Sequence, residues 1–206
     1  MTKLSSHFQD ICAVETTMAA AADSVDANLR RFGPVKRGHC KGLDEALGWL
    51  LPLASFSTRY LVVPCSEWTL LLSNGRSIAA DDQLFSVSKA AGCRGAYGRW
   101  ASDSCMWQVV EAGRETRSII CYLDGGRWVF HQQGGPLPFE NRMLYEKRRK
   151  RDRLTPEVVQ DYLSQLLHMP FPPDWRSLMS QETVCLERST HEFRTPVEEY
   201  AVEVDL

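Results

Sequence analysis

The chain has 206 residues, of which 44% are hydrophobic and 24% are charged, and its formal net charge is −2. These ordinary globular values exclude a disordered chain and allow one domain with a substantial core. The slightly acidic balance also excludes a general electrostatic attraction to nucleic acid or anionic lipid, so any such binding has to be local. We therefore expect residues 1–206 to fold as a single domain.

The beginning of the chain lacks the pattern of an export signal. Asp10 and Glu15 interrupt the stretch where a secretory signal needs continuous apolar residues. The most apolar segment, residues 46–56, is far shorter than the roughly 20 residues that cross a bilayer. Seven cysteines, an odd number, lie in apolar surroundings, which favours buried, reduced thiols over exported disulfides. We therefore expect a cytoplasmic protein that does not enter a membrane.

A long helix is predicted at the N-terminus. Apolar residues recur every three or four positions over residues 8–32, which is the spacing of one apolar helix face. Ser6 with Gln9 fits a capping box, and the Gly-Pro pair at 33–34 fits a helix end. The stripe favours packing on a sheet over a coiled-coil seam, because the repeat is not sustained beyond this segment.

The pattern then changes from helix to strand. A basic loop over residues 36–41 precedes a short helix over residues 43–51, which a proline ends. The run RYLVVPC, from Arg59, is strand-like. The next run, EWTLLLSNG, places Trp68, Leu70 and Leu72 on one face before an Asn-Gly turn at 74–75. These two runs therefore predict the start of a sheet.

A second helix and four further strands are predicted in the middle of the chain. Asp81 or Asp82 caps the helix, which runs to Ala91 and ends at Gly92. Short connections, which include the turn-formers Gly113 and Asp124-Gly125-Gly126, join the strand-like runs and imply antiparallel pairing. The four runs are RGAYGRW, CMWQVVEA, TRSIICYLD and RWVFHQQ.

The last third returns to helices. One is predicted from about Glu140, and another opens at Thr155, which is followed by a proline and an acid suited to a first turn. The runs TVCLERS and EYAVEVDL are the remaining strand candidates. The whole pattern predicts an α+β fold: a mostly antiparallel sheet of about six strands, with the N-terminal long helix and the C-terminal helices packed on it.

Sequence signals for catalysis or metal binding are weak. Clustered zinc ligands need pairs such as Cys-x-x-Cys, and the only adjacent His/Cys pair is His39-Cys40. Cys121 and His131 lie on neighbouring predicted strands and are the best nucleophile and base, but an inert buried thiol is favoured in so apolar a run. Neither a serine elbow nor a phosphate-binding glycine loop occurs. We expect a non-enzymatic protein without cofactor or metal, with an active site assembled from distant residues as the alternative.

A dense basic run is the first candidate binding surface. It could hold phosphates, although the cations also suit a helix C-terminus and can pair with nearby acids such as Glu146. No aromatic residues suited to base stacking are interleaved with it, so nucleic-acid binding is the alternative and not the leading hypothesis. The candidate residues are Lys147, Arg148, Arg149, Lys150, Arg151 and Arg153.

An acidic face is the second candidate surface. The predicted terminal strand has one apolar and one acidic side, and the acids include Glu199, Glu203 and Asp205. Acids on an edge strand usually prevent edge-to-edge association, which is the favoured role, but they could also capture a basic partner. Asp81 and Asp82 carry a similar ambiguity, although helix capping is the simpler account of them. These five acids are the candidate partner-binding residues.

Three stretches carry a resemblance to a known family: TRYLVVPCSEWTLLLSNG, AGCRG and GGRWVFHQQGGPLPFENRMLYEKRRKRDRLTPEVVQDYL. Over residues 59–166 the chain resembles small bacterial immunity proteins encoded beside polymorphic toxins, including Rhs-type and secretion-system effectors. The resemblance marks a recurring framework that we interpret as supporting the fold: Trp68, Asn74, Gly75, Trp128, Phe139, Glu140, Tyr145, Arg149, Asp152 and Arg153.

The resemblance also implies a function. A protein of this kind sits in the cytoplasm of the toxin-producing cell, binds the cognate toxin domain in a tight one-to-one complex and blocks it. This expectation agrees with the weak signals for catalysis. The alternative is a nucleic-acid-binding or regulatory protein that uses the basic run over residues 147–153.

Overall fold

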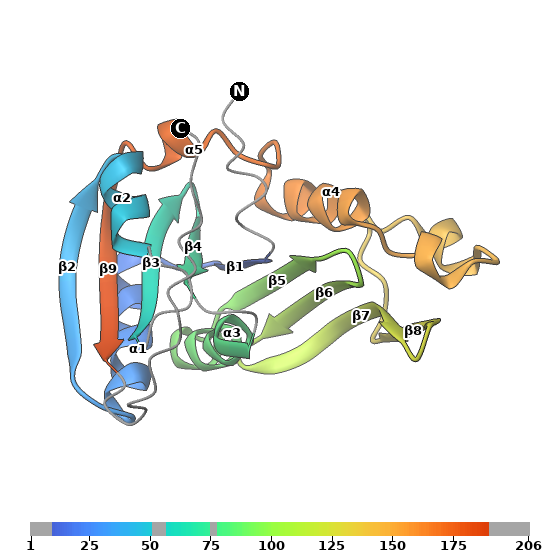
Figure 1. The fold of residues 1–206 in the computed structure, drawn as a ribbon, viewed down its shortest axis with the longest axis horizontal. Coiled ribbons are helices and arrows are strands. Elements are labelled where there is room, and N and C mark those ends of the chain that lie inside the picture. The colour runs from blue at the N-terminus through green and yellow to red at the C-terminus, as the bar shows by residue number, and fades with distance from the viewer. Residues whose placement is uncertain (1–9, 51–56, 75–77, 190–206) are drawn as a thin grey trace.

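The described part of the protein is built on one nine-stranded antiparallel sheet. A computed structural model describes residues 10–50, 57–74 and 78–189. Within them the strand order is β2-β9-β3-β4-β1-β5-β6-β7-β8, so β2 and β8 form the two edges (Figure 1). The strands are β1 (Asp10–Val14), β2 (Val35–Lys41), β3 (Ser57–Cys65), β4 (Trp68–Ser73), β5 (Arg94–Trp100), β6 (Ser104–Glu111), β7 (Arg114–Asp124), β8 (Arg127–Gln133) and β9 (Glu182–Ser189).

Helices cover both faces of this sheet. The α-helices are α1 (Met18–Arg30), α2 (Leu43–Leu50), α3 (Ile78–Ala91), α4 (Pro156–Leu167) and α5 (Trp175–Leu178), and two 3-10 helices, η2 (Arg142–Glu146) and η3 (Lys150–Asp152), precede α4. Buried residues of α2, α4 and α5 belong to one core cluster, and those of α1 and α3 belong to a second cluster on the other face. None of the helices in the described ranges combines the length and apolar character that a bilayer crossing requires.

The alternation of side chains along β4 decides which core each residue joins. Trp68, Leu70 and Leu72 point into the first cluster, whereas Leu71 points into the second. The prediction that the first three share one face is therefore confirmed. The α+β class and the mostly antiparallel sheet are confirmed as well, but the prediction of about six strands is wrong, because the described residues form nine.

The predicted N-terminal long helix is also wrong in its first half. Residues 10–14 form β1, which lies between β4 and β5 and is buried on both faces. A central strand covered on both sides reads as a continuous apolar run, so its residues fitted a helical spacing as well as a strand. The helix begins only at Met18, after Thr17, whose Oγ1 accepts a hydrogen bond from the Ala20 amide. Ser6 and Gln9 lie outside the described residues.

Two further local predictions need correction. The predicted basic loop over 36–41 is the edge strand β2, which pairs with β9 along its whole length. The α3 helix begins at Ile78, so Asp81 and Asp82 lie inside it and neither is its N-cap. The strand predicted over residues 199–206 lies outside the described residues.

The predicted helix from Glu140 is replaced by the two 3-10 helices. Asn141 caps η2, since its Oδ1 accepts a hydrogen bond of 3.2 Å from the Met143 amide. The helix predicted at Thr155 is confirmed as α4, and the Thr155 side chain accepts a hydrogen bond from the Val158 amide.

Candidate functional site

The candidate site is a lobe that projects beside the last strand of the sheet. We call residues 142–153 the basic lobe; they contain η2 and η3 and connect β8 to α4 (Figure 1). Two residues attach the lobe to the core: Tyr145 within the lobe, and Leu154, the first residue after the lobe. Both are buried in the first core cluster. Met143, in contrast, is 80% exposed. The lobe thus has anchored ends and an exposed outer surface.

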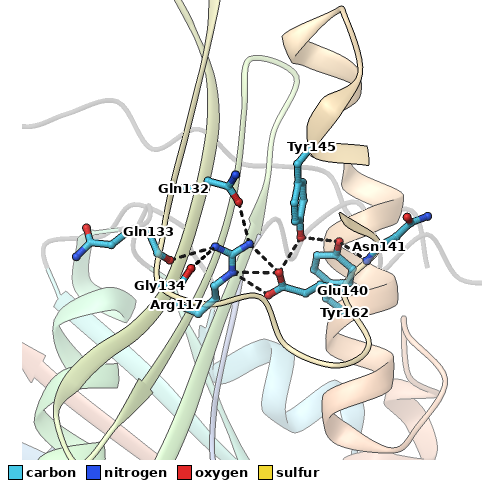
Figure 2. A network of polar contacts seen from close by, with 8 residues as sticks. All are labelled: Arg117, Gln132, Gln133, Gly134, Glu140, Asn141, Tyr145 and Tyr162. Atoms are coloured by element: carbon cyan, nitrogen blue, oxygen red, sulfur yellow. Dashed lines mark hydrogen bonds and ion pairs between the residues drawn. The ribbon is translucent and has the colours of Figure 1, made fainter. Parts of the chain in front are cut away.

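A buried polar network holds this attachment in place. We call Arg117, Glu140, Tyr145 and Tyr162 the latch. Arg117 Nη2 and Glu140 Oε2 are 2.7 Å apart, and the two side chains are 1% and 0% exposed. The Tyr145 hydroxyl donates to Glu140 Oε2 at 2.9 Å and lies 2.8 Å from the Tyr162 hydroxyl, which also accepts from the Asn141 amide (Figure 2). The latch therefore joins β7, the start of the lobe and α4.

Every N–H group of the Arg117 guanidinium has a partner. Nε and Nη2 donate to the Glu140 carboxylate, and Nη1 donates to the main-chain oxygens of Gln133 and Gly134 at 3.2 and 3.1 Å. Nη2 also donates to Gln132 Oε1 at 3.2 Å (Figure 2). A buried charge is costly unless it is paired and fully hydrogen-bonded, so this arrangement fixes the end of β8 relative to β7.

Electrostatics favour one protonation state for the latch. Burial alone opposes the charge on Arg117, but hydrogen bonds and attraction from Glu140 outweigh it and raise the pKa of Arg117. Burial also raises the pKa of Tyr145 and of Tyr162 above the ordinary value for a phenol. The guanidinium therefore stays charged and both phenols stay neutral at physiological pH. These shifts describe a fixed structural network, since none brings a proton transfer into the neutral range.

The cations of the lobe point away from this network. Arg153 is half-buried: its Nε donates to the Lys147 main-chain oxygen at 2.7 Å, and its Cζ lies 5.2 Å from the centre of the Phe130 ring. The Cys121 thiol donates to the Lys150 main-chain oxygen at 3.3 Å, which attaches η3 to β7. The remaining side chains of the predicted basic run are exposed: Lys147, Arg148, Arg149, Lys150 and Arg151.

The lobe is a local excess of positive charge. Residues 142–153 hold seven Lys or Arg and two acids, a net charge of +5. Because the whole chain carries −2, all other residues together carry −7. Arg151 and Asp152 are 3.5 Å apart, but both side chains are more than 40% exposed, so the pair is weak in water. The lobe is thus suited to a partner of negative potential.

The structure does not place the predicted acidic surface. Asp81 and Asp82 lie on the α3 helix, and their side chains are not among those described. Glu199, Glu203 and Asp205 lie outside the described residues. A partner-binding role for these five acids stays a prediction.

The candidate nucleophile and base do not meet. Cys121 faces Phe130 across the β7–β8 pair, whereas His131 faces Ile120. Adjacent positions on a strand point to opposite faces, so the thiol and the imidazole lie on opposite sides of the sheet. Burial raises the pKa of Cys121, which keeps it a thiol.

The adjacent His39 and Cys40 likewise point to opposite faces of β2, with His39 exposed and Cys40 buried. Within the part of the chain that the structure describes, no three His, Cys, Asp or Glu side chains are grouped so that they could hold a metal ion.

Arg117 and Tyr162 are the latch residues that sequence reasoning missed. Arg117 occurs in TRSIICYLD, where a cation at the start of an apolar strand is unusual and was the available signal. Nothing in the sequence pairs it with Glu140, which lies 23 positions later. The resemblance to immunity proteins did mark Glu140 and Tyr145 as framework residues.

In its described residues, the chain is an α+β protein. It has a nine-stranded antiparallel sheet, helices on both faces of the sheet and a basic lobe beside the β8 edge. No family model matches the chain, and no curated protein or solved structure is significantly similar to it.

Proposed function

We propose that this protein is an immunity protein that binds a cognate bacterial toxin domain in a tight one-to-one complex and neutralises it without catalysis. The interaction takes place in the cytoplasm of the toxin-producing cell. The resemblance over residues 59–166 supports this function. The observation that carries it is the basic lobe, an exposed surface of +5 held in one arrangement by a buried network.

Preorganisation is what makes the lobe suited to tight binding. Association costs free energy for every loop and side chain that becomes ordered, so a surface fixed in advance loses less on binding. The latch and Leu154 fix the lobe at both ends, while its cations other than Arg153 are exposed. A charge excess of this size also accelerates the encounter with a partner of opposite potential.

Three of the residues marked by the resemblance, Trp68, Asn74 and Phe139, support the fold, whereas Arg149 is exposed. Trp68 is buried, and the Phe139 ring lies 5.9 Å from the ring of Tyr162 in the latch. Asn74 Oδ1 accepts a hydrogen bond of 2.8 Å from the Arg59 amide at the end of the β3–β4 pair. Such residues keep a scaffold in shape, which leaves the exposed surface as the part that recognises a partner.

Co-expression with the product of the adjacent gene tests the proposal. That product, expressed alone, is expected to arrest growth, and the present protein is expected to restore it. A pull-down followed by size-exclusion chromatography with light scattering should show one copy of each chain. An adjacent product that is harmless, or that stays toxic when both are expressed, would contradict the proposal.

Nucleic-acid binding is the second candidate function, and the +5 charge of the lobe is the observation that favours it. In that case the affinity for DNA or RNA falls steeply as salt rises. Replacing Arg148, Arg149 and Arg151 by alanine abolishes it. Lack of retention on either polymer at low salt eliminates this function.

A further inference from the structure

Among the described strands, β8 has a neighbour on one side only. No other strand of the described residues pairs with β8 on its outer side, and three of its seven residues are half-buried while four are exposed. Its segment Trp128–Gln133 contains aromatic and β-branched residues, no proline and no Lys, Arg, Asp or Glu. The register with β7 runs without a bulge from Ser118–Gln133 to Asp124–Arg127.

An edge of this kind is a template for another strand. Proteins usually protect exposed edges with charged side chains, proline or bulges, because the outward N–H and C=O groups pair readily with a further strand. The Trp128–Gln133 segment has none of these protections. No described strand occupies this edge, so it can accept a further strand, for which main-chain hydrogen bonds provide affinity.

The basic lobe lies directly against this edge strand. The Arg153 guanidinium stacks over the Phe130 ring of β8, and η3 is attached to β7 through Cys121. The latch also ends on β8, because Arg117 donates to the main chain of Gln133. The strand edge and the cations thus form one continuous, fixed surface.

We infer that this surface takes an acidic extended segment of the partner protein, which adds to β8 as a tenth strand while its carboxylates meet the lobe. The inference rests on the proposed function and names the docking surface for it. A second copy of this chain is a poorer occupant, because two β8 edges brought together would also bring together two lobes of +5. A nucleic acid could use the cations but not the main-chain edge.

Hydrogen exchange of the protein in complex with the adjacent gene product tests the strand addition. Outward amides of β8 are expected to exchange at least tenfold more slowly in the complex, while amides of the opposite edge strand β2 are unchanged. Unchanged exchange over residues 127–133 in a complex that forms would overturn the inference and leave the proposed function intact.

A charge variant tests the acidic character of the segment. Arg148→Glu replaces an exposed cation of the lobe by an acid and is expected to weaken binding at least tenfold. Lys36→Glu is the matched control: it also lowers the net charge by two, but on the opposite edge, and it should leave affinity unchanged.

The outcomes separate the two proposals. If Arg148→Glu binds as tightly as the unchanged protein, or if the control loses as much affinity, the docking surface lies elsewhere. If the adjacent product does not bind at all, both the function and the surface are wrong. Tight binding to a 20-nucleotide single-stranded DNA that competes with the adjacent product would replace the acidic protein segment by a nucleic acid.

Discussion

The two edges of the sheet carry cations in different ways. On β2, the Arg37 guanidinium is 2.6 Å from Asp23 of α1, and His39 is 3.0 Å from Glu182 of β9. Beside β8, the exposed cations of the lobe follow one another with only two acids among them. Acids of neighbouring elements therefore offset positive charge at the β2 edge. The region beside the β8 edge keeps its positive potential.

The difference shows that a basic run does not by itself predict a binding surface, because neighbouring acids decide how much positive potential remains. Residues 36–41 and residues 147–153 are both basic in sequence. The first is itself the edge strand, and its cations protect that edge from further pairing. The second lies on a lobe next to an unprotected strand, so its field extends towards a partner.

Breaking the latch should have the largest effect, because the β8 end depends on it. Arg117→Met leaves the Glu140 carboxylate buried without its main partner, which costs about 3–5 kcal/mol. The free energy of unfolding from denaturant titration measures this loss. In the double variant Arg117→Met and Glu140→Leu, much of the stability should return, because no buried charge is left unpaired. A double variant as unstable as the single one would argue against an electrostatic cause.

Gly134, where the latch meets the end of β8, provides the next test. Its φ of 78° disfavours a side chain, and an added Cβ would collide with the main-chain oxygen of Thr116. Gly134→Ala is therefore expected to lower the free energy of unfolding by about 1–3 kcal/mol. Gly135→Ala is the matched control, since nothing lies within 4 Å of its Cβ position. Equal losses in both variants would exclude a specific constraint at Gly134.

Removal of one hydroxyl from the latch should have a smaller effect. Tyr145→Phe deletes the donor to Glu140 and the contact with Tyr162, at a cost of about 1–2 kcal/mol. Tyr122→Phe, at a half-buried position of β7 outside the latch, should cost less. Thermal and denaturant unfolding of both variants makes the comparison.

The same variant predicts a pH dependence. Burial raises the pKa of Tyr145 in the folded protein above its ordinary value of 10.0. A pKa that is raised on folding contributes stability below the unfolded value and loses it as pH rises above that value. Stability should therefore fall above about pH 10, and the fall should be shallower in Tyr145→Phe. Identical slopes in the two proteins would mean that Tyr145 does not titrate differently on folding.

Much of the sheet could be predicted because the strands in the middle of the chain are delimited clearly. Period-two alternation and short turns, two of them with glycine, delimit β5 to β8, and the helix signal at Thr155 gives α4. β1 was missed because a strand buried on both faces has no alternation. β2 was missed because Cys40 is its only buried residue, so its sequence has the polarity of a loop.

The candidate site was only half predictable. The basic run is visible in the sequence, and its exposure follows from its charge. The latch is not visible in the sequence. It joins Arg117 to Glu140, which follows β8 in the chain, and to Tyr162 on α4, and a single sequence contains no signal for such pairings. For the same reason the strand order, which puts β8 at an edge, could not be derived from local patterns.

The smallest expected effect distinguishes the two edges most directly. Arg37→Ala removes a surface ion pair with Asp23 and should cost 0 to about 1 kcal/mol, and less at high salt. Arg148→Ala should change the free energy of unfolding by less than about 0.5 kcal/mol, because its side chain is exposed. Association with the adjacent gene product should respond in the opposite order: slower for Arg148→Ala, unchanged for Arg37→Ala. Stopped-flow rates at two salt concentrations measure this, and equal rates for both variants would mean that the lobe does not guide the partner.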